Sequence, residues 1–106
     1  MVKRFEVYLV NLDDEPSDDP KNTRPAVVIS PDEMNTNIGY VLIAPISSTK
    51  RPYPTRIPVE LLDNERMIVL DQIRAVDKVR LVKKIGEIDK KSGAAALDRL
   101  QEMFAP

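Results

Sequence analysis

The stretch Thr23-Arg24-Pro25-Ala26-Val27-Val28-Ile29-Ser30-Pro31 decides the fold that this sequence predicts. Residues 26–29 are apolar with no polar alternation, which indicates a strand buried on both faces. Pro25 fixes its own φ and favours an extended Arg24, so the arginine stands on a stiff base at the rim of a core. Such a guanidinium is well placed to grip a phosphate, although a solvated arginine before an ordinary core strand is the simpler interpretation.

The composition of this 106-residue chain excludes whole classes of chemistry. The length fits one domain, which we expect to span residues 1–106, and its core must be mainly aliphatic because three tyrosines and two phenylalanines are the only aromatic residues. Cysteine and histidine are both absent, which excludes disulfides, thiolate metal sites and every histidine-dependent triad. We therefore expect no cofactor and no metal.

The charge and hydropathy of the chain limit its partners and its location. The net charge is −1 and the pI about 5.5, so any nucleic-acid binding must rest on a local patch. The longest apolar run, at 41–46, is far shorter than the ~20 residues that span a bilayer, and the N-terminus has no signal-peptide core. We expect a soluble cytoplasmic protein with no membrane partner.

The rest of the chain predicts six or seven short strands and a terminal helix. Strands are expected over 5–12, 25–30, 38–46, 55–61, 66–70 running on into 71–77, and 82–88, with a turn or short helix at 78–81. Pro58 marks its strand as a sheet edge, and Pro45 is expected at an edge or a bulge. A mainly β fold follows, as a small antiparallel barrel with the C-terminal helix packed on it.

Two helices are expected from their end signals. Residues 31–37 are expected to form a turn or a single helical turn, and Ser30 as cap with Pro31 as first residue would suit a short helix. Asp89 or Ser92 caps the terminal helix. The apolar residues of that helix recur at three- and four-residue spacing and predict its packing face: Ala96, Leu97, Leu100, Met103 and Phe104.

Two loops carry candidate functional groups. Residues 13–22 hold five acids and two prolines, and are either a mobile flap over a groove or an inert solvated loop. In residues 47–54, three hydroxyl side chains precede two cations and Tyr53. Hydroxyls beside cations cradle phosphate oxygens and a tyrosine stacks on bases, although hydroxyl-rich turns are also common without function.

Several cations could form a local positive groove: Lys21, Arg24, Lys50, Arg51 and Arg56. A second basic cluster, at 78–84, is best interpreted as a solvated face. Asp71 ends a buried strand and is either catalytic or bonded to backbone or to Arg74.

Four stretches, in this order and spacing, resemble the MazF/PemK family of toxins from bacterial toxin–antitoxin pairs. They are Val7-Tyr8-Leu9-Val10, Thr23-Arg24-Pro25-Ala26-Val27-Val28, Ala44-Pro45-Ile46-Ser47-Ser48 and Val69-Leu70-Asp71-Gln72-Ile73-Arg74-Ala75-Val76-Asp77. The resemblance covers nearly the whole chain. It implies an SH3-like barrel of the CcdB/MazF/PemK type that forms a homodimer, cleaves single-stranded RNA at short sequences without a metal, and is inhibited by an antitoxin whose tail lies across the RNA groove.

The resemblance also implies roles for individual residues. Arg24 matches the family's catalytic arginine, Ser47 a hydroxyl that holds the scissile phosphate, and Asp71 an aspartate given a general-base role in some members. The RNA-binding candidates are Lys21, Ser48, Thr49, Lys50, Arg51, Tyr53, Arg56 and Gln72. Attack by the RNA 2′-hydroxyl would leave a 2′,3′-cyclic phosphate.

The sequence departs from the family pattern in two places, and the second departure favours an alternative function. Phe5 stands where members commonly carry glycine, and the loop at 13–22 is acidic and glycine-free where theirs is usually glycine-rich. A non-catalytic CcdB-like or SH3-like protein-binding module is the alternative function.

Overall fold

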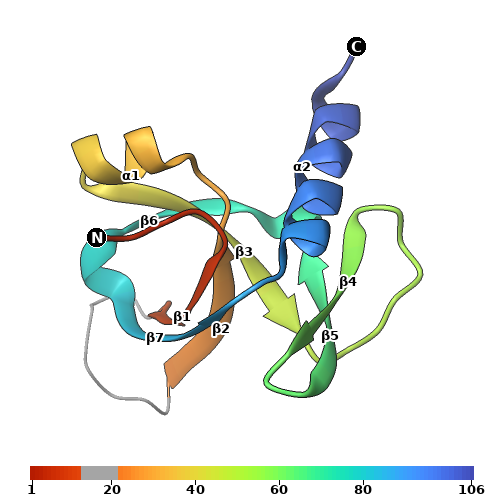
Figure 1. Cartoon of the computed structure of the whole chain (residues 1–106), viewed down its shortest axis with the longest axis horizontal. Helices are drawn as coiled ribbons and strands as arrows, with labels where there is room; N and C mark the ends of the chain where they lie inside the picture. Colours follow the sequence, from red (N-terminus) through yellow and green to blue (C-terminus); the bar gives the residue numbers. More distant parts are fainter. Residues whose placement is uncertain (13–21) are drawn as a thin grey trace.

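One curled antiparallel sheet and a long C-terminal helix make up the computed structural model in Figure 1, which describes residues 1–12 and 22–106. The strands are β1 (Glu6–Asn11), β2 (Thr23–Val28), β3 (Tyr40–Ser47), β4 (Arg56–Leu61), β5 (Asn64–Val69), β6 (Arg74–Asp77) and β7 (Leu81–Glu87). The helices are α1 (Asp32–Asn37) and α2 (Lys90–Phe104), with 3₁₀ turns η2 (Leu70–Gln72) and η3 (Lys78–Arg80). The predicted class is confirmed: mainly β, with a barrel-like antiparallel sheet and a C-terminal helix.

The strand order is β4-β5-β3-β2-β1-β7, and β6 pairs with β3 beside β5. β2 lies between β1 and β3, and its apolar residues are buried on both faces as predicted. Val27 and Ile29 enter one hydrophobic cluster, which also holds Ala96 of α2, whereas Ala26 and Val28 enter the other. The Arg-Pro strand therefore separates two halves of the core, and its first residues emerge at the rim.

The β4–β5 hairpin forms one end of the strand order, and β7 forms the other. Pro58 lies in the edge strand β4, as predicted. Its turn residues, Leu62 and Asp63, have φ values of 51° and 64°. Positive φ at both central residues gives a two-residue turn whose backbone twist matches that of the two antiparallel strands it joins. This tight turn fixes the register that places Arg56 opposite Val69.

The position of Pro45 differs from the prediction, because β3 is an internal strand. Pro45 lies opposite Ala26 of β2. On its other side β3 pairs with β6 as far as Ile43 and with β5 from Ile46 onward. The proline therefore lies where β3 changes from one partner strand to the next. The ladder is interrupted at this point, so the proline is tolerated without an edge strand or a bulge.

The start of α1 was also predicted wrongly. Pro31 is the cap residue rather than the first helical residue, and no side chain caps this helix. Ser30 is buried: its hydroxyl donates to Asn35 and accepts the backbone N–H of Leu42. The serine therefore joins α1 to β3 instead of capping the helix.

Helix α2 begins as predicted, because the Asp89 carboxylate accepts the N–H of Ser92 at 3.3 Å. Ala96 is fully buried and Leu100 and Met103 pack against the same cluster. Phe104 was expected on this packing face but is 72% exposed. Figure 1 shows the reason: the last turn of α2 projects beyond the sheet.

The N-terminal half of α2 contacts Phe5 closely. Phe5 adopts a φ of 76°, a region that favours glycine. A Cβ at Gly93 would lie only 2.5 Å from the Phe5 ring, so the glycine makes room for this aromatic contact. The departure from the family pattern at Phe5 thus has a packing role.

Among the described residues, no helix has the length and apolar character needed to cross a bilayer.

Candidate functional site

A groove of about 540 Å³ opens where β2, β3, β4 and β5 meet. Its polar lining consists of Arg24, Ser47, Ser48, Arg56, Arg66 and Gln72. Five of these six were predicted as site residues, and Arg66 was not. Among the described lining residues there are three arginines and no carboxylate, so the groove is suited to an anionic ligand.

The sheet register brings two of the three predicted catalytic residues, Arg24 and Ser47, together. Ala26 of β2 faces Pro45 of β3 in an antiparallel pair. Extending that register by two residues places Arg24 beside Ser47 at the rim of the groove. Residues 23 positions apart in the chain therefore meet because the two strands run in opposite directions.

Arg24 is exposed, and its Nη1 donates to the Thr23 carbonyl at 3.1 Å. Within residues 1–12 and 22–106, no carboxylate forms an ion pair with it. Its backbone is fixed by pairing with Val10 of β1 and by the following Pro25. The guanidinium thus combines a rigid mount with donors that remain available to a ligand.

Ser47 lies half-buried at the end of β3, where its hydroxyl oxygen accepts the N–H of Thr49 at 3.0 Å. A serine hydroxyl also carries one proton to donate. That donor is available to a phosphate oxygen in the groove. Ser48 lines the same groove and is exposed.

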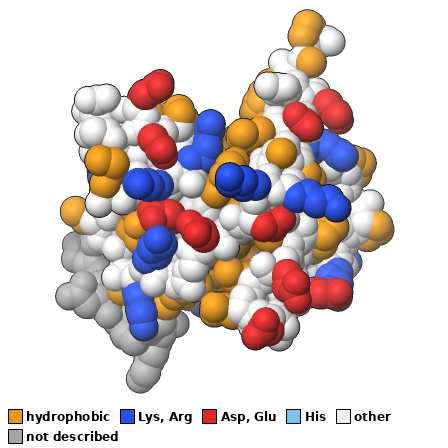
Figure 2. Space-filling view, viewed as in Figure 1, with side chains coloured by type: hydrophobic (Ala, Val, Ile, Leu, Met, Phe, Trp, Pro, Cys, Tyr) orange, Lys and Arg blue, Asp and Glu red, His pale blue; other side chains and the backbone are white. Residues whose placement is uncertain are grey.

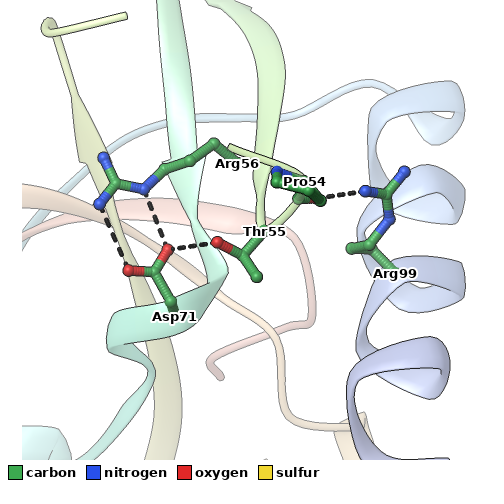
Figure 3. Close-up of polar contacts among 5 residues, drawn as sticks. All are labelled: Pro54, Thr55, Arg56, Asp71 and Arg99. Carbon is green, nitrogen blue, oxygen red and sulfur yellow. Dashed lines mark hydrogen bonds and ion pairs between the residues drawn. The ribbon is translucent and has the colours of Figure 1, made fainter. Parts of the chain in front are cut away.

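Arg56 and Asp71 form a two-bond ion pair, which Figure 3 shows. Nε of Arg56 lies 3.0 Å from Oδ1 of Asp71, and Nη2 lies 3.3 Å from Oδ2. The Thr55 hydroxyl donates to Oδ1 at 2.8 Å. Hydrogen bonding to Arg56 lowers the pKa of Asp71, and the same bonds raise the pKa of Arg56. Asp71 bonds Arg56 rather than Arg74, and it is outside the groove lining. Its role as a general base stays a prediction.

The Tyr53 ring lies beside the Arg56 guanidinium. The guanidinium carbon is 5.2 Å from the ring centroid, within cation–π range. The ring is 51% exposed. One part of the predicted base-stacking surface is therefore taken by Arg56.

Among the described residues, three further RNA-binding candidates, Thr49, Lys50 and Arg51, are not in the lining of the groove that holds Arg24 and Ser47. Lys50 pairs with Glu65 and lines a second groove, of about 810 Å³, between the β4–β5 hairpin and α2. Thr49 and Arg51 are exposed. Lys21 and the loop at 13–21 lie outside the described residues. Residue-level binding roles therefore stay predictions.

Two of the four cations in the second basic cluster, Arg80 and Lys84, bind other groups of the protein. Lys84 pairs with the buried Glu6 at 2.7 Å, and Arg80 donates to the Asn11 carbonyl at 3.2 Å. Burial raises the Glu6 pKa, but bonds from Lys84, the Lys3 backbone and Tyr8 outweigh it and lower the pKa overall. Basic and acidic side chains also alternate over the face shown in Figure 2, without one extended basic patch.

Arg66 is the functional candidate that sequence analysis missed. It lines both grooves and so stands on the ridge between them. The sequence placed it at the start of a buried strand, but β5 is exposed in its first half and buried only from Met67. Arg66 pairs with Val59 across the hairpin. The sequence would have predicted this pairing if the tight turn had been assigned to residues 62–63.

In the part of the chain that the structure describes, His, Cys, Asp and Glu side chains form no group of three that could hold a metal ion.

Comparison with known proteins agrees with this arrangement of strands. Residues 3–104 match the model of a family described as the PemK-like, MazF-like toxin of type II toxin–antitoxin systems. A protein named endoribonuclease MazF, from Staphylococcus epidermidis, is 34% identical over 91 residues, which cover 80% of this chain and 76% of that protein. The chain therefore belongs to the PemK-like, MazF-like toxin family.

Solved structures agree with the fold. One is titled as an endoribonuclease in complex with its cognate antitoxin from Mycobacterial species: the TM-score is 0.84 at 19% identity, covering 100% of this chain and 98% of that one. A MazE–MazF structure from Deinococcus radiodurans has a TM-score of 0.77 at 20% identity, covering 99% and 95%.

Proposed function

We propose that this chain, residues 1–106 as one domain, is an endoribonuclease toxin that cleaves single-stranded RNA at a short sequence without a metal. The observation that carries the proposal is the meeting of Arg24, Ser47 and Arg56 in one groove of a MazF-like toxin. A relative at 34% identity is named an endoribonuclease. The groove supplies cations and hydroxyl donors, which suit a phosphate backbone.

RNA carries its own nucleophile in this mechanism. The 2′-oxygen attacks the neighbouring phosphorus, the bond from phosphorus to the 5′-oxygen breaks, and a 2′,3′-cyclic phosphate and a 5′-hydroxyl result. Arg24 donates to the non-bridging oxygens as negative charge grows on them, and Ser47 holds the phosphate in line. With no histidine in the chain, the 2′-hydroxyl proton passes to a carboxylate, to water or to an arginine, and the departing 5′-oxygen takes up a proton from that same group or from water.

The partners in this proposal are the RNA, a cognate antitoxin and a second copy of the chain, all in the cytoplasm. Two similar structures are titled as complexes with an antitoxin or with MazE. The alternative of a non-catalytic CcdB-like or SH3-like module is not favoured, because the matching family and the curated relative are a MazF-like toxin and an endoribonuclease.

The decisive experiment incubates purified protein with single-stranded RNA in EDTA and maps the cut ends. We expect cleavage that leaves a cyclic phosphate and a 5′-hydroxyl. The same oligonucleotide with one 2′-deoxy nucleotide at the mapped site should resist cleavage, because it lacks the nucleophile. Cleavage of the deoxy oligonucleotide would refute 2′-hydroxyl attack, and activity that appears only with added metal would refute metal independence.

A further inference from the structure

We propose that Asp71 is a positioning residue, which holds Arg56 so that the outer edge of its guanidinium binds an RNA phosphate in the groove. The proposal rests on the endoribonuclease function proposed above and gives Asp71 a role other than that of general base. It gives separate roles to two of the three arginines that line the groove: Arg24 acts on the reacting phosphate, and Arg56 binds a neighbouring one.

The geometry of the guanidinium supports this division. A guanidinium has five N–H donors in a planar fork. The edge formed by Nε and Nη2 is occupied by the two carboxylate oxygens of Asp71. Three N–H donors remain, two on Nη1 and one on Nη2. One from each nitrogen lies along the outer edge, and these two can donate to two oxygens of a phosphate in the same two-bond manner. Arg56 lines the groove and Asp71 does not, so this second edge is the one available to a ligand there.

Contacts with several neighbouring residues hold Arg56 in place. Its side chain is only 12% exposed, and the Tyr53 ring lies against it. The backbone N–H of Arg56 donates to the Tyr53 carbonyl at 3.0 Å, and that of Leu70 donates to the Thr55 carbonyl at 3.0 Å. The segment before Arg56 and the η2 turn carrying Asp71 are thus joined through backbone as well as side chains.

Helix α2 holds the same segment from its other side. Arg99 donates to the carbonyl of Pro54, and Figure 3 shows this contact beside the Thr55–Asp71–Arg56 group. Ordering a long side chain before the ligand arrives lowers the entropy lost on binding. The whole arrangement prepares Arg56 as a fixed donor.

The ion pair also makes Asp71 a weak proton acceptor. Two bonds from Arg56 and one from Thr55 occupy its oxygens, and its pKa lies below the ordinary value because of the Arg56 bonds. A general base works best with a pKa near the operating pH. Positioning of Arg56 is therefore the role that fits these contacts.

The test separates RNA binding from the chemical step in Asp71→Asn. Binding is measured by fluorescence anisotropy on the RNA with a 2′-deoxy nucleotide at the mapped cut site, and cleavage is measured in single turnover at saturating RNA. We expect roughly a two- to tenfold weaker binding, the range for releasing one ordered side chain, with little change in the saturated rate. Weaker binding is diagnostic, because the loss of a negative charge by itself strengthens binding to RNA.

Asp98→Asn is the matched control. Asp98 is an exposed carboxylate on α2, outside both grooves, so its substitution changes the net charge equally. We expect binding unchanged or slightly tighter in this variant. In an Arg56→Ala background, Asp71→Asn should cause no further loss, because the two residues act as a unit.

Unchanged binding with a slower saturated rate in Asp71→Asn would overturn the proposal in favour of a general base, as would a full additional loss in the Arg56→Ala background. If Asp71→Asn does not fold, Arg56→Lys keeps the charge and removes the fork, and unchanged binding in it would overturn the proposal equally. A wild-type protein that cuts no RNA would refute the endoribonuclease itself, whereas cleavage with unchanged binding would refute only this inference.

Discussion

The two arginines Arg24 and Arg56 line one groove but are held in opposite ways. Arg24 is exposed, and its side chain bonds only the carbonyl of its own neighbour among the described residues. Arg56 is 12% exposed and is fixed by Asp71 on one edge and Tyr53 on one face. Arg24 owes its position to a rigid backbone, because β2 is paired on both sides and Pro25 follows it.

This difference indicates a division of labour. A guanidinium without a carboxylate partner can give all its donors to charge that appears during reaction. A guanidinium already bonded to a carboxylate has part of its charge compensated and is better suited to steady binding. Loss of Arg24 should therefore affect the rate, and disturbance of Arg56 the affinity.

The largest effect is expected from Arg24→Ala. Removing one preorganised donor to the transition state typically lowers the rate by about 10²–10³-fold, and we expect at least this in single-turnover cleavage. The melting temperature should stay near that of the wild type, because the side chain is exposed. Arg74→Ala, which removes an exposed cation from β6, is the control and should cleave normally. An active Arg24→Ala protein would remove the contrast between the two arginines.

A smaller effect is expected from Tyr53. Tyr53→Leu removes the ring beside Arg56 and should weaken RNA binding roughly two- to fivefold, the range for an exposed cation–π contact. Tyr53→Phe keeps the ring and should bind as the wild type does. Anisotropy on the deoxy RNA measures both variants. If Tyr53→Leu loses affinity even in an Arg56→Ala background, the ring contacts RNA directly and does not act through Arg56.

The smallest effect concerns stability and pH. Arg56 lowers the pKa of Asp71 below its ordinary 3.8 in the folded protein. A lowered native pKa stabilises the folded state above the unfolded value, and this contribution disappears as the pH falls through the native value. Urea unfolding of wild type and Asp71→Asn should therefore differ more at pH 7 than at pH 3. Glu6 shifts in the same direction and is present in both proteins, so the difference isolates Asp71. A gap that stays constant with pH would show that the ion pair adds no stability.

Much of the fold was predictable because it depends on local pattern. The unbroken apolar run of β2, the edge proline of β4 and the Asp89 cap of α2 each act within a few residues of sequence, and all three predictions were confirmed. Pro45 and Phe104 were placed wrongly, because their surroundings depend on distant elements: the change of partner along β3, and the length of α2 beyond the sheet.

In the candidate site, too, features with a local sequence signal were predicted and features that depend on distant elements were not. Sequence analysis found Arg24 and Ser47, since a rigid Arg-Pro strand and a hydroxyl-rich strand end are visible in the chain and match a family pattern. It did not find Arg66 as a lining residue, nor the bonding of Asp71 to Arg56. These depend on the register of the β4–β5 hairpin and on the backbone bond that joins η2 to Thr55.

The sequence by itself determined the β architecture, the absence of histidine and cysteine chemistry, and the arginine that stands at the rim of the core. Only the tertiary structure decided which cations share a groove and which carboxylate is already bound to one of them. The physical reason is that hydropathy and backbone preference act between near neighbours in the chain. Electrostatic pairing depends on distance in space, which is set only when the strands are in register.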